Sequence, residues 1–166
     1  ERKTNTIKWN DTTLIHGRFV LKNDSIYDIE LFAQRGKNPF LRYLQRDILG
    51  GGARITLNDH ARLGLGLLSE DEEDMDSIKT RTGRVASYFH DDYEVAKDID
   101  FNLTVYYQPS LDSSEDFKAS VIGALDFKMN EKFKITLQYN TFYDSRPPVT
   151  AVKRDEGIAT NFSYSF

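Results

Sequence analysis

Cysteine, long apolar runs and an excess of basic residues are all missing from this chain. Because none of the 166 residues is cysteine, disulfides and thiolate metal sites are excluded. No apolar run approaches the ~18 residues that a membrane-spanning helix needs, and the mean hydropathy of −0.55 also excludes a helical membrane protein. The 26 acidic residues outnumber the 22 basic ones, and the formal charge of −4 gives no case for a nucleic-acid partner.

The chain does show a sequence period of two, which is clearest in the last ten residues, Gly157–Phe166. Phe162, Tyr164 and Phe166 fall on one face of this segment, and small polar residues fall on the other. Such an apolar edge strand would promote aggregation of a soluble protein, whereas in a closed membrane barrel it pairs with the first strand and faces lipid. The terminal aromatic residues also resemble the signal by which the barrel-assembly machinery recognises outer-membrane proteins.

Alternation along the whole chain predicts an all-β fold, a transmembrane antiparallel up-and-down β-barrel of about ten strands in a single domain spanning residues 1–166. An aromatic content of 13% suits the interfacial girdles of such a barrel. The expected strands are Lys3–Trp9, Thr12–Lys22, Ser25–Gln34, Phe40–Leu57, His60–Leu68, Thr80–Val95, Asp98–Gln108, Phe117–Met129, Lys132–Tyr143 and Gly157–Phe166.

The connections between these segments alternate between short and long. The short ones are the tight turns Asn23-Asp24, Asn58-Asp59, Ala96-Lys97 and Asn130-Glu131, in which Asn and Asp tolerate the left-handed backbone region. The long ones are the polar segments Arg35–Pro39, Ser69–Lys79, Ser110–Asp116 and Asp144–Glu156. This alternation is typical of barrels with periplasmic turns and extracellular loops.

The inner face of the expected barrel is rich in charged side chains. A barrel of about ten strands is narrow, so we expect these residues to fill the lumen with ion pairs; a path for ions or small solutes is the alternative. The polar residues expected to line the lumen are Arg18, Glu30, Arg54, Arg62, Arg84, Asp100, Asp126 and Lys128. A soluble sandwich or lipocalin-like barrel with its apolar face inward would show the same alternation, but the long strands with aromatic ends favour the membrane barrel.

Two features of the expected strands need a special explanation. Asp91 falls on the lipid face of Thr80–Val95, which requires either a bulge near His90 or a position at the rim. The glycines of the central strands have a steric role, since no helix follows to form a phosphate loop. The glycines that superficially suggest phosphate binding are Gly50, Gly51, Gly52, Gly64 and Gly66. The steric role, which clears lumen space for long side chains opposite, is assigned to Gly50, Gly52, Gly64 and Gly66.

Catalytic and metal-binding signals are weak. The three histidines are His16, His60 and His90. His90 with Asp91 and Asp92 superficially offers a base and its orienter, but Asp91 points to the opposite face of the strand. The acidic run Glu70–Asp74 lacks the spacing of a calcium loop and reads as a hydrated extracellular loop with weak cation binding as the alternative. We therefore expect no catalytic residue, no cofactor and no metal.

The run Arg42–Leu57 pairs an arginine, Arg46, with a glycine-rich strand that ends in Arg54. Near the end, Tyr143, Asp144, Arg146 and Pro147 follow an aromatic strand, and Lys153, Arg154 and Asp155 precede the last one. In these motifs the chain resembles the YdiY-like family of salt-induced outer-membrane proteins. The resemblance implies an outer-membrane barrel of largely unknown function and supplies no catalytic residues.

The sequence thus leads to a non-enzymatic protein of the bacterial outer membrane with a structural or scaffold role in the envelope. A narrow channel and a hydrolase at the barrel rim are the alternatives. Expected partners are outer-membrane lipid, lipopolysaccharide and the barrel-assembly machinery, and a larger assembly with other outer-membrane proteins stays open. No signal peptide begins at Glu1, so we expect a secreted chain to have lost it already.

Overall fold

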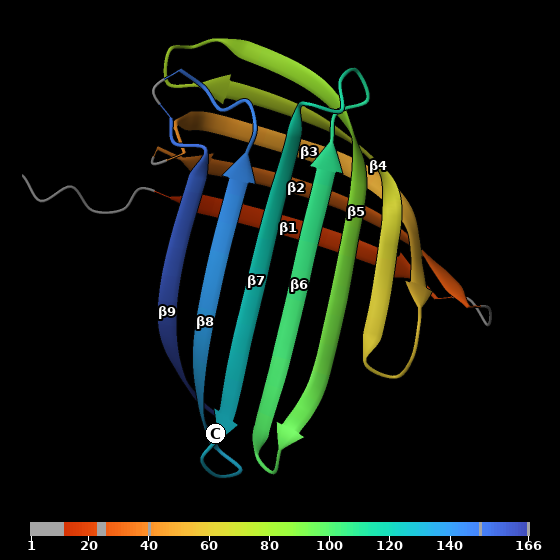
Figure 1. Cartoon of the computed structure of the whole chain (residues 1–166), viewed down its shortest axis with the longest axis vertical. Helices are drawn as coiled ribbons and strands as arrows, with labels where there is room; N and C mark the ends of the chain where they lie inside the picture. The colour runs from red at the N-terminus through yellow and green to blue at the C-terminus, as the bar shows by residue number, and fades with distance from the viewer. Residues whose placement is uncertain (1–11, 23–25, 40, 150, 166) are drawn as a thin grey trace, which may run out of the picture.

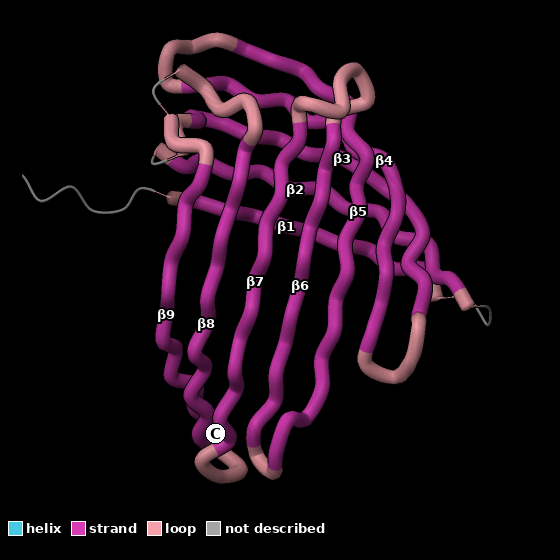
Figure 2. The backbone as a smooth tube through the Cα atoms, in the orientation of Figure 1, coloured by secondary structure: helices cyan, strands magenta, loops and turns pink. Residues whose placement is uncertain are grey.

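The computed structural model describes residues 12–22, 26–39, 41–149 and 151–165, and they form one antiparallel sheet in which each strand pairs with the next. The strands are β1 (Thr13–Leu21), β2 (Tyr27–Asn38), β3 (Tyr43–Thr56), β4 (Ala61–Asp74), β5 (Lys79–Ala96), β6 (Ile99–Pro109), β7 (Phe117–Lys128), β8 (Phe133–Asp144) and β9 (Arg154–Tyr164). Figure 2 shows strands joined by loops throughout this part of the chain. None of the described residues belongs to a helix that is long and apolar enough to cross a membrane.

The sheet curls into a half-barrel, in which β1, β2 and β3 pass behind β6 to β9 at a steep angle (Figure 1). The prediction of an all-β antiparallel up-and-down sheet is confirmed. Instead of about ten strands the structure has nine in its described part, where β1 pairs only with β2 and β9 only with β8. The first expected strand, Lys3–Trp9, lies outside the described residues, and so does its expected pairing with the last strand.

A pair of glycines lets the sheet bend sharply between β3 and β4. Gly52 lies directly opposite Gly66, and a Cβ atom on either residue would come within 2.3 Å of a carbonyl oxygen of the neighbouring strand. Real Cβ atoms do not approach a backbone oxygen so closely, so only glycine fits at these two positions. The backbone itself therefore fills the inside of this corner.

Two further glycines make room for aromatic rings on the same face. A Cβ atom on Gly50 would lie 2.4 Å from Cζ of Phe32, and one on Gly64 would lie 2.0 Å from Cε1 of Tyr88. These rings come from the strands on either side of the β3–β4 pair. The prediction that glycines clear space for long side chains is confirmed at Gly50 and Gly64, whereas at Gly52 and Gly66 the neighbouring backbone occupies that space.

Asparagine side chains stabilise two of the predicted tight turns. Asn58 Oδ1 accepts hydrogen bonds from the backbone amides two and three residues later, at 2.8 and 2.7 Å, and Asn130 Oδ1 does the same at 2.9 Å. The turn between β5 and β6 lies one residue later than predicted, at Lys97-Asp98, where Asp98 has a φ of 66°. The turn predicted at Asn23-Asp24 lies outside the described residues.

The predicted loop Ser69–Lys79 is wrong. Strand β4 continues to Asp74 and β5 begins at Lys79, so the acidic run is part of the sheet. The carboxylates are tolerated in a strand because cations on neighbouring strands face them, as described below. The segment Arg35–Pro39 is likewise mostly strand, since β2 extends to Asn38.

The other two long connections are closer to the prediction. Ser110–Asp116 lies between β6 and β7 as expected, and the connection after β8 is shorter than expected because β9 begins at Arg154. The bulge expected near His90 is absent, since the pairing of β4 with β5 is continuous there. Asp91 pairs with Ala61, the first residue of β4, and on its other side with Leu103 inside β6, so it lies beside the end of β4 but within β5.

The buried residues of this sheet are mostly polar. In the described part of the chain only three apolar side chains are buried, against eight polar or charged ones. The apolar ones are Ile48, Ala61 and Leu68, and the polar ones are Glu30, Arg46, Glu70, Asp74, Arg84, Ser110, Lys118 and Asp144. Large apolar side chains are exposed instead, as shown by Leu65 at 59% and Leu67 at 57%.

Candidate functional site

The concave face of the half-barrel carries the charged residues that the sequence assigns to the lumen. All eight have ion-pair partners: Arg18 and Arg54 with Glu30, Arg62 with Asp92, Arg84 with Glu70, Asp100 with Lys128, and Asp126 with Lys134. Alternate residues of a strand point to the same face. Where the strands pair continuously, even-numbered residues lie opposite even-numbered ones, and all eight residues have even numbers. They therefore share one face of the sheet. They do not form one site but fall into separate groups.

The largest group, which we call the Glu70 network, surrounds a carboxylate that is 2% exposed. Glu70 on β4 accepts hydrogen bonds from Arg46 on β3, from Nε of Arg84 on β5 at 2.6 Å and from Nζ of Lys118 on β7 at 2.7 Å. Three cations from three other strands therefore converge on one carboxylate. Charge-assisted hydrogen bonds of this kind are about twice as strong as neutral ones.

More carboxylates complete the network around the same cations. Lys118 donates a second hydrogen bond to Glu72 at 2.8 Å and lies 3.6 Å from Asp144, while Arg84 donates to Asp116 at 2.9 Å. Each buried cation thus has at least two acidic neighbours. Removal of one partner would leave an uncompensated buried charge, which is far more costly than loss of a surface pair.

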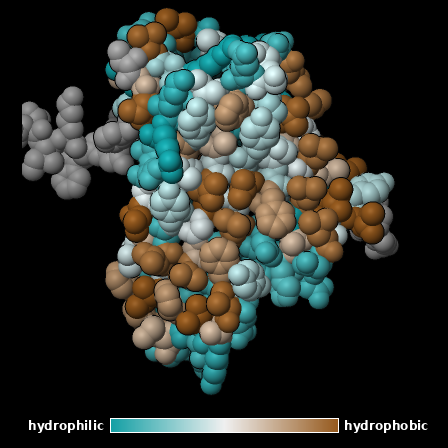
Figure 3. Space-filling view, in the orientation of Figure 1, coloured by the Kyte–Doolittle hydropathy of each residue, from teal (hydrophilic) through white to brown (hydrophobic). Residues whose placement is uncertain are grey.

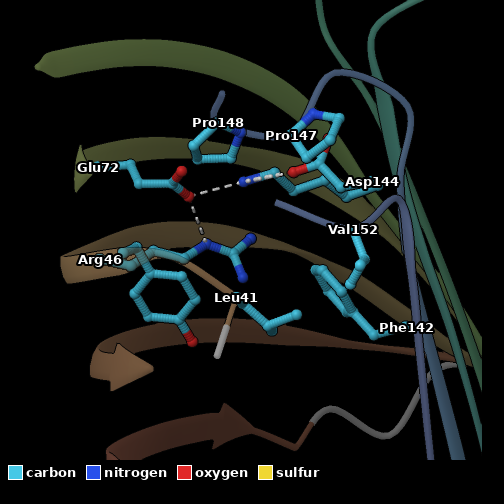
Figure 4. Close-up of a pocket in the computed structure, with 10 residues that line it drawn as sticks. Leu41, Arg46, Glu72, Phe142, Asp144, Pro147, Pro148 and Val152 are labelled. Carbon is cyan, nitrogen blue, oxygen red and sulfur yellow. Dashed lines mark hydrogen bonds and ion pairs between the residues drawn. The ribbon is translucent and has the colours of Figure 1, made fainter. Parts of the chain in front are cut away.

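The side of the network nearest the loop after β8 is closely packed (Figure 4). Arg46 and Glu72 face one another there, with Phe142, Pro147 and Pro148 beside them. The space left between these residues is about 10 Å³, close to the smallest volume that holds a water molecule. Side chains therefore fill this part of the concave face.

A second group surrounds Glu30, which is 3% exposed. Tyr88 donates its hydroxyl hydrogen to Glu30 at 2.8 Å, Arg54 lies 3.4 Å from this carboxylate and Arg18 lies 3.8 Å from it. Arg54 also donates to Asp28 at 2.6 Å. The guanidinium of Arg18 lies over the Tyr88 ring, 5.2 Å from its centre, in cation–π geometry.

A third group contains His90, which has a carboxylate neighbour. His90 Nδ1 lies 2.9 Å from the hydroxyl of Thr104, and Nε2 lies 3.3 Å from Asp92. Arg62 lies 3.5 Å from the same aspartate. Asp91 is on the opposite face, as predicted, so the partner of His90 is two residues away rather than one.

Two cavities lie between and beside these groups on the concave face. The larger has a volume of about 580 Å³ and is lined by aromatic, aliphatic and polar side chains, including Phe32, Ile48 and Tyr106. The smaller has a volume of about 200 Å³ and adjoins the arginines of the second and third groups. In the described part of the chain no three His, Asp or Glu side chains converge as a set of metal ligands.

The opposite, convex face carries a row of ion pairs that runs across four strands. We call this set, Arg35, Asp47, Asp71 and Arg81, the outer ion-pair row; consecutive members are directly opposite on β2, β3, β4 and β5. Arg35 binds Asp47 through two hydrogen bonds of 2.7 and 2.9 Å, and Arg81 binds Asp71 at 2.6 and 2.9 Å. Hydrogen bonds from these arginines lower the pKa of both carboxyl groups.

Strand β9 places two of the three aromatic residues assigned to the assembly signal. Phe162 pairs with Ile135 and Tyr164 with Phe133, so both lie on the apolar face of β8 and are exposed. The rings of Phe162 and Phe133 stack at 6.4 Å between centres. Phe166 lies outside the described residues.

These features define an all-β protein with an inverted arrangement, in which charge networks line a curled up-and-down sheet and apolar side chains cover its outer surface. The chain belongs to the family described as a protein of unknown function, DUF481, whose model matches residues 3–166. This agrees with the family resemblance seen in the sequence motifs. Comparison with curated proteins and with solved structures gives no match.

Proposed function

We propose that the protein is a β-barrel of the bacterial outer membrane with a non-enzymatic structural or scaffold role in the cell envelope. The observation that carries this proposal is the inverted burial of polar and apolar residues. A soluble protein buries its large apolar side chains and rarely buries charges in such number. A membrane barrel does the reverse on its outer face, because lipid replaces the protein core as the apolar surrounding.

The distribution of outer side chains supports the proposal further. On β4 the outward residues Leu63, Leu65 and Leu67 are exposed. Further along the same face of this strand, beyond Ser69, Asp71 belongs to the outer ion-pair row. Figure 3 shows many hydrophobic side chains across the middle and lower left of the face in view, with mostly hydrophilic ones above them and others at the lower edge. This pattern is that of an apolar band with a polar border, as a bilayer and its headgroup region require.

The close packing of the Glu70 network across part of the concave face favours a scaffold over a channel. The Glu70 network spans β3 to β7 with little space between its side chains, and such a group of ion pairs obstructs a path along the lumen. The narrow channel stays the second hypothesis and predicts stepwise conductance in planar bilayers. A rim hydrolase around His90 is the third and predicts turnover of lipid or peptide substrates.

The partners follow from the proposed location. The convex face would contact outer-membrane lipid, and the outer ion-pair row would lie at the level of charged headgroups such as those of lipopolysaccharide. The barrel-assembly machinery would read Phe162, Tyr164 and Phe166 during insertion. Other outer-membrane proteins are candidates for the role of scaffold partner.

The direct test is heat modifiability in detergent. We expect the folded chain to require detergent for a monodisperse state and to migrate differently on a gel before and after boiling. Both properties follow from a stable sheet whose outer surface is apolar. Identical migration together with a monodisperse state in detergent-free buffer would contradict the proposal.

A further inference from the structure

We infer that the concave face binds a small amphiphilic anion, with its charged group among Arg18, Arg54 and Arg62 and its apolar part in the adjoining larger cavity. The inference rests on the concave side of the sheet alone. It therefore does not depend on whether the convex face meets lipid, and it goes beyond the proposed scaffold role.

The smaller cavity, which we call the arginine pocket, has the composition of an anion site. Its wall contains the three arginines together with His90 and Thr104, and two tyrosines complete it without any carboxylate. Every one of these side chains can donate a hydrogen bond. With about 200 Å³, the pocket has room for several water molecules of about 30 Å³ each, or for one phosphate or carboxylate group.

The acidic partners of the arginines orient them without fully occupying their donors. Arg54 is fixed by its 2.6 Å hydrogen bond to Asp28. Arg18 lies 3.8 Å from Glu30 and Arg62 lies 3.5 Å from Asp92, both longer than the 2.7–3.2 Å of good hydrogen bonds. Arg18 and Arg62 therefore keep donor capacity for a ligand. Because guanidinium groups match planar carboxylate and phosphate oxygens, an anion is the ligand that fits.

The larger cavity explains why the anion would carry an apolar part. It shares Arg18, Tyr88 and Tyr106 with the arginine pocket, so the two spaces adjoin at these side chains. Beyond them its wall includes Phe32, whose ring lies against Gly50 of the sheet, and the side chain of Ile48. A volume of about 580 Å³ is within the range of small-molecule sites, which are mainly apolar with a few polar groups that orient the ligand.

The test compares three probes on the folded protein in a non-ionic detergent, whose headgroup carries no charge to compete for the arginines. Phenyl phosphate combines both features of the inferred ligand, benzyl alcohol lacks the charge, and inorganic phosphate lacks the apolar part. By titration calorimetry we expect phenyl phosphate to bind at least about tenfold more tightly than either of the others. Dodecyl phosphate in the same micelles then distinguishes a lipid-derived ligand, which it would mimic better, from a soluble one.

Variants locate the site. Arg18→Gln and Arg62→Gln should each weaken phenyl phosphate binding by about tenfold, since each removes a charge-assisted contact. Arg81→Gln is the matched control, because that arginine belongs to the convex face, and it should bind phenyl phosphate as the natural chain does. Unchanged affinity in the Arg18 and Arg62 variants would overturn the inference. So would equal affinity of the natural chain for phenyl phosphate and benzyl alcohol, a result that needs no variant to fold.

Discussion

At the scale of single residues, the contrast between Glu70 and Asp71 shows how one strand places equal charges in opposite surroundings. The two are adjacent on β4 and both have arginine partners. Glu70 is buried under three cations, whereas the Asp71–Arg81 pair is exposed to its surroundings. Exposed pairs contribute about 0–1 kcal/mol to stability, but breaking a buried pair costs about 3–5 kcal/mol.

The first prediction follows from this contrast. Glu70→Gln should reduce the free energy of unfolding by about 3–5 kcal/mol, because three cations lose their common counter-charge. Asp71→Asn on the same strand is the control and should cost much less, because this pair is exposed. Urea unfolding in detergent, followed by circular dichroism, measures both. Equal effects of the two variants would show that the Glu70 network does not stabilise the fold.

The second prediction concerns the titration of Asp71. Arg81 lowers its pKa below the ordinary 3.8 by hydrogen bonding, so the stabilising effect of the ionised pair is full at neutral pH. It is lost only as the pH falls through the lowered pKa of the folded state. Arg81→Gln should bring the pKa of Asp71 back toward 3.8, which a carboxyl-detected NMR titration can follow. An unchanged pKa would mean that the pair does not form.

At the scale of elements, the corner between β3 and β4 depends on Gly52 and Gly66. Gly52→Ala should destabilise the fold by about 1–3 kcal/mol, since its Cβ atom would meet the backbone of β4 rather than a movable side chain. Gly157→Ala on β9 is the matched control, because a Cβ atom there meets nothing within 4 Å. Thermal unfolding of the two variants gives the comparison. A Gly52 variant as stable as the Gly157 variant would contradict the close approach of the strands.

The faces of β8 give the fourth prediction. Leu137→Arg should cost about 2–4 kcal/mol if this outward position lies near the middle of a bilayer, because it pairs with Leu125 and Thr160 and has no carboxylate opposite. Gln138→Arg, one residue later and on the concave face, should be much milder. Leu103 is a poorer choice, since Asp91 lies opposite and would pair with the new arginine. Equal costs in a folding titration in lipid vesicles would reverse the assignment of inside and outside.

The sequence predicted some elements well and others poorly, and charge is the reason for the difference. Strands with clean alternation, such as β6, β7 and β8, have nearly the predicted bounds. The sequence did not predict the end of β4, because five consecutive acidic residues resemble a hydrated loop. Nothing in the neighbouring sequence indicates that Glu70 and Glu72 contact cations from β3, β5 and β7. For the same reason, the sequence did not identify Arg46 and Asp116 as members of the Glu70 network.

A signal for the missed part does exist in the sequence. Arg81 and Lys79 follow the acidic run at the spacing of a hairpin, and the structure pairs them with Asp71 and Glu73. Opposite charges that face one another across a short connection indicate paired strands rather than a loop. The arginine pocket could not be found in this way, because its residues come from five strands and meet only when the sheet curls.

At the scale of the whole molecule, delivery to the membrane and stability within it should be separable. Deletion of Phe166 should lower the membrane yield in cells more than the refolding yield in micelles, since the assembly machinery would read the terminal aromatic residue and detergent would not. Ser165→Ala is the control, because it leaves the aromatic residues in place. A full membrane yield without Phe166 would remove the argument for an assembly signal.

The curl of the sheet also sets an order of events during folding. Each hairpin joins neighbouring strands through short chain separations, and such contacts form early because little loop entropy is lost. The bonds across the concave face are different: Tyr88 and Glu30 are 58 residues apart, and Lys118 and Glu70 are 48 apart. The Tyr88–Glu30 bond spans β3 and β4 and therefore needs the bend at Gly52 and Gly66, whereas the Lys118–Glu70 bond needs the strands from β4 to β7 to curl. We therefore expect the charged interior to be the last part of the molecule to assemble, after every hairpin that supplies its side chains.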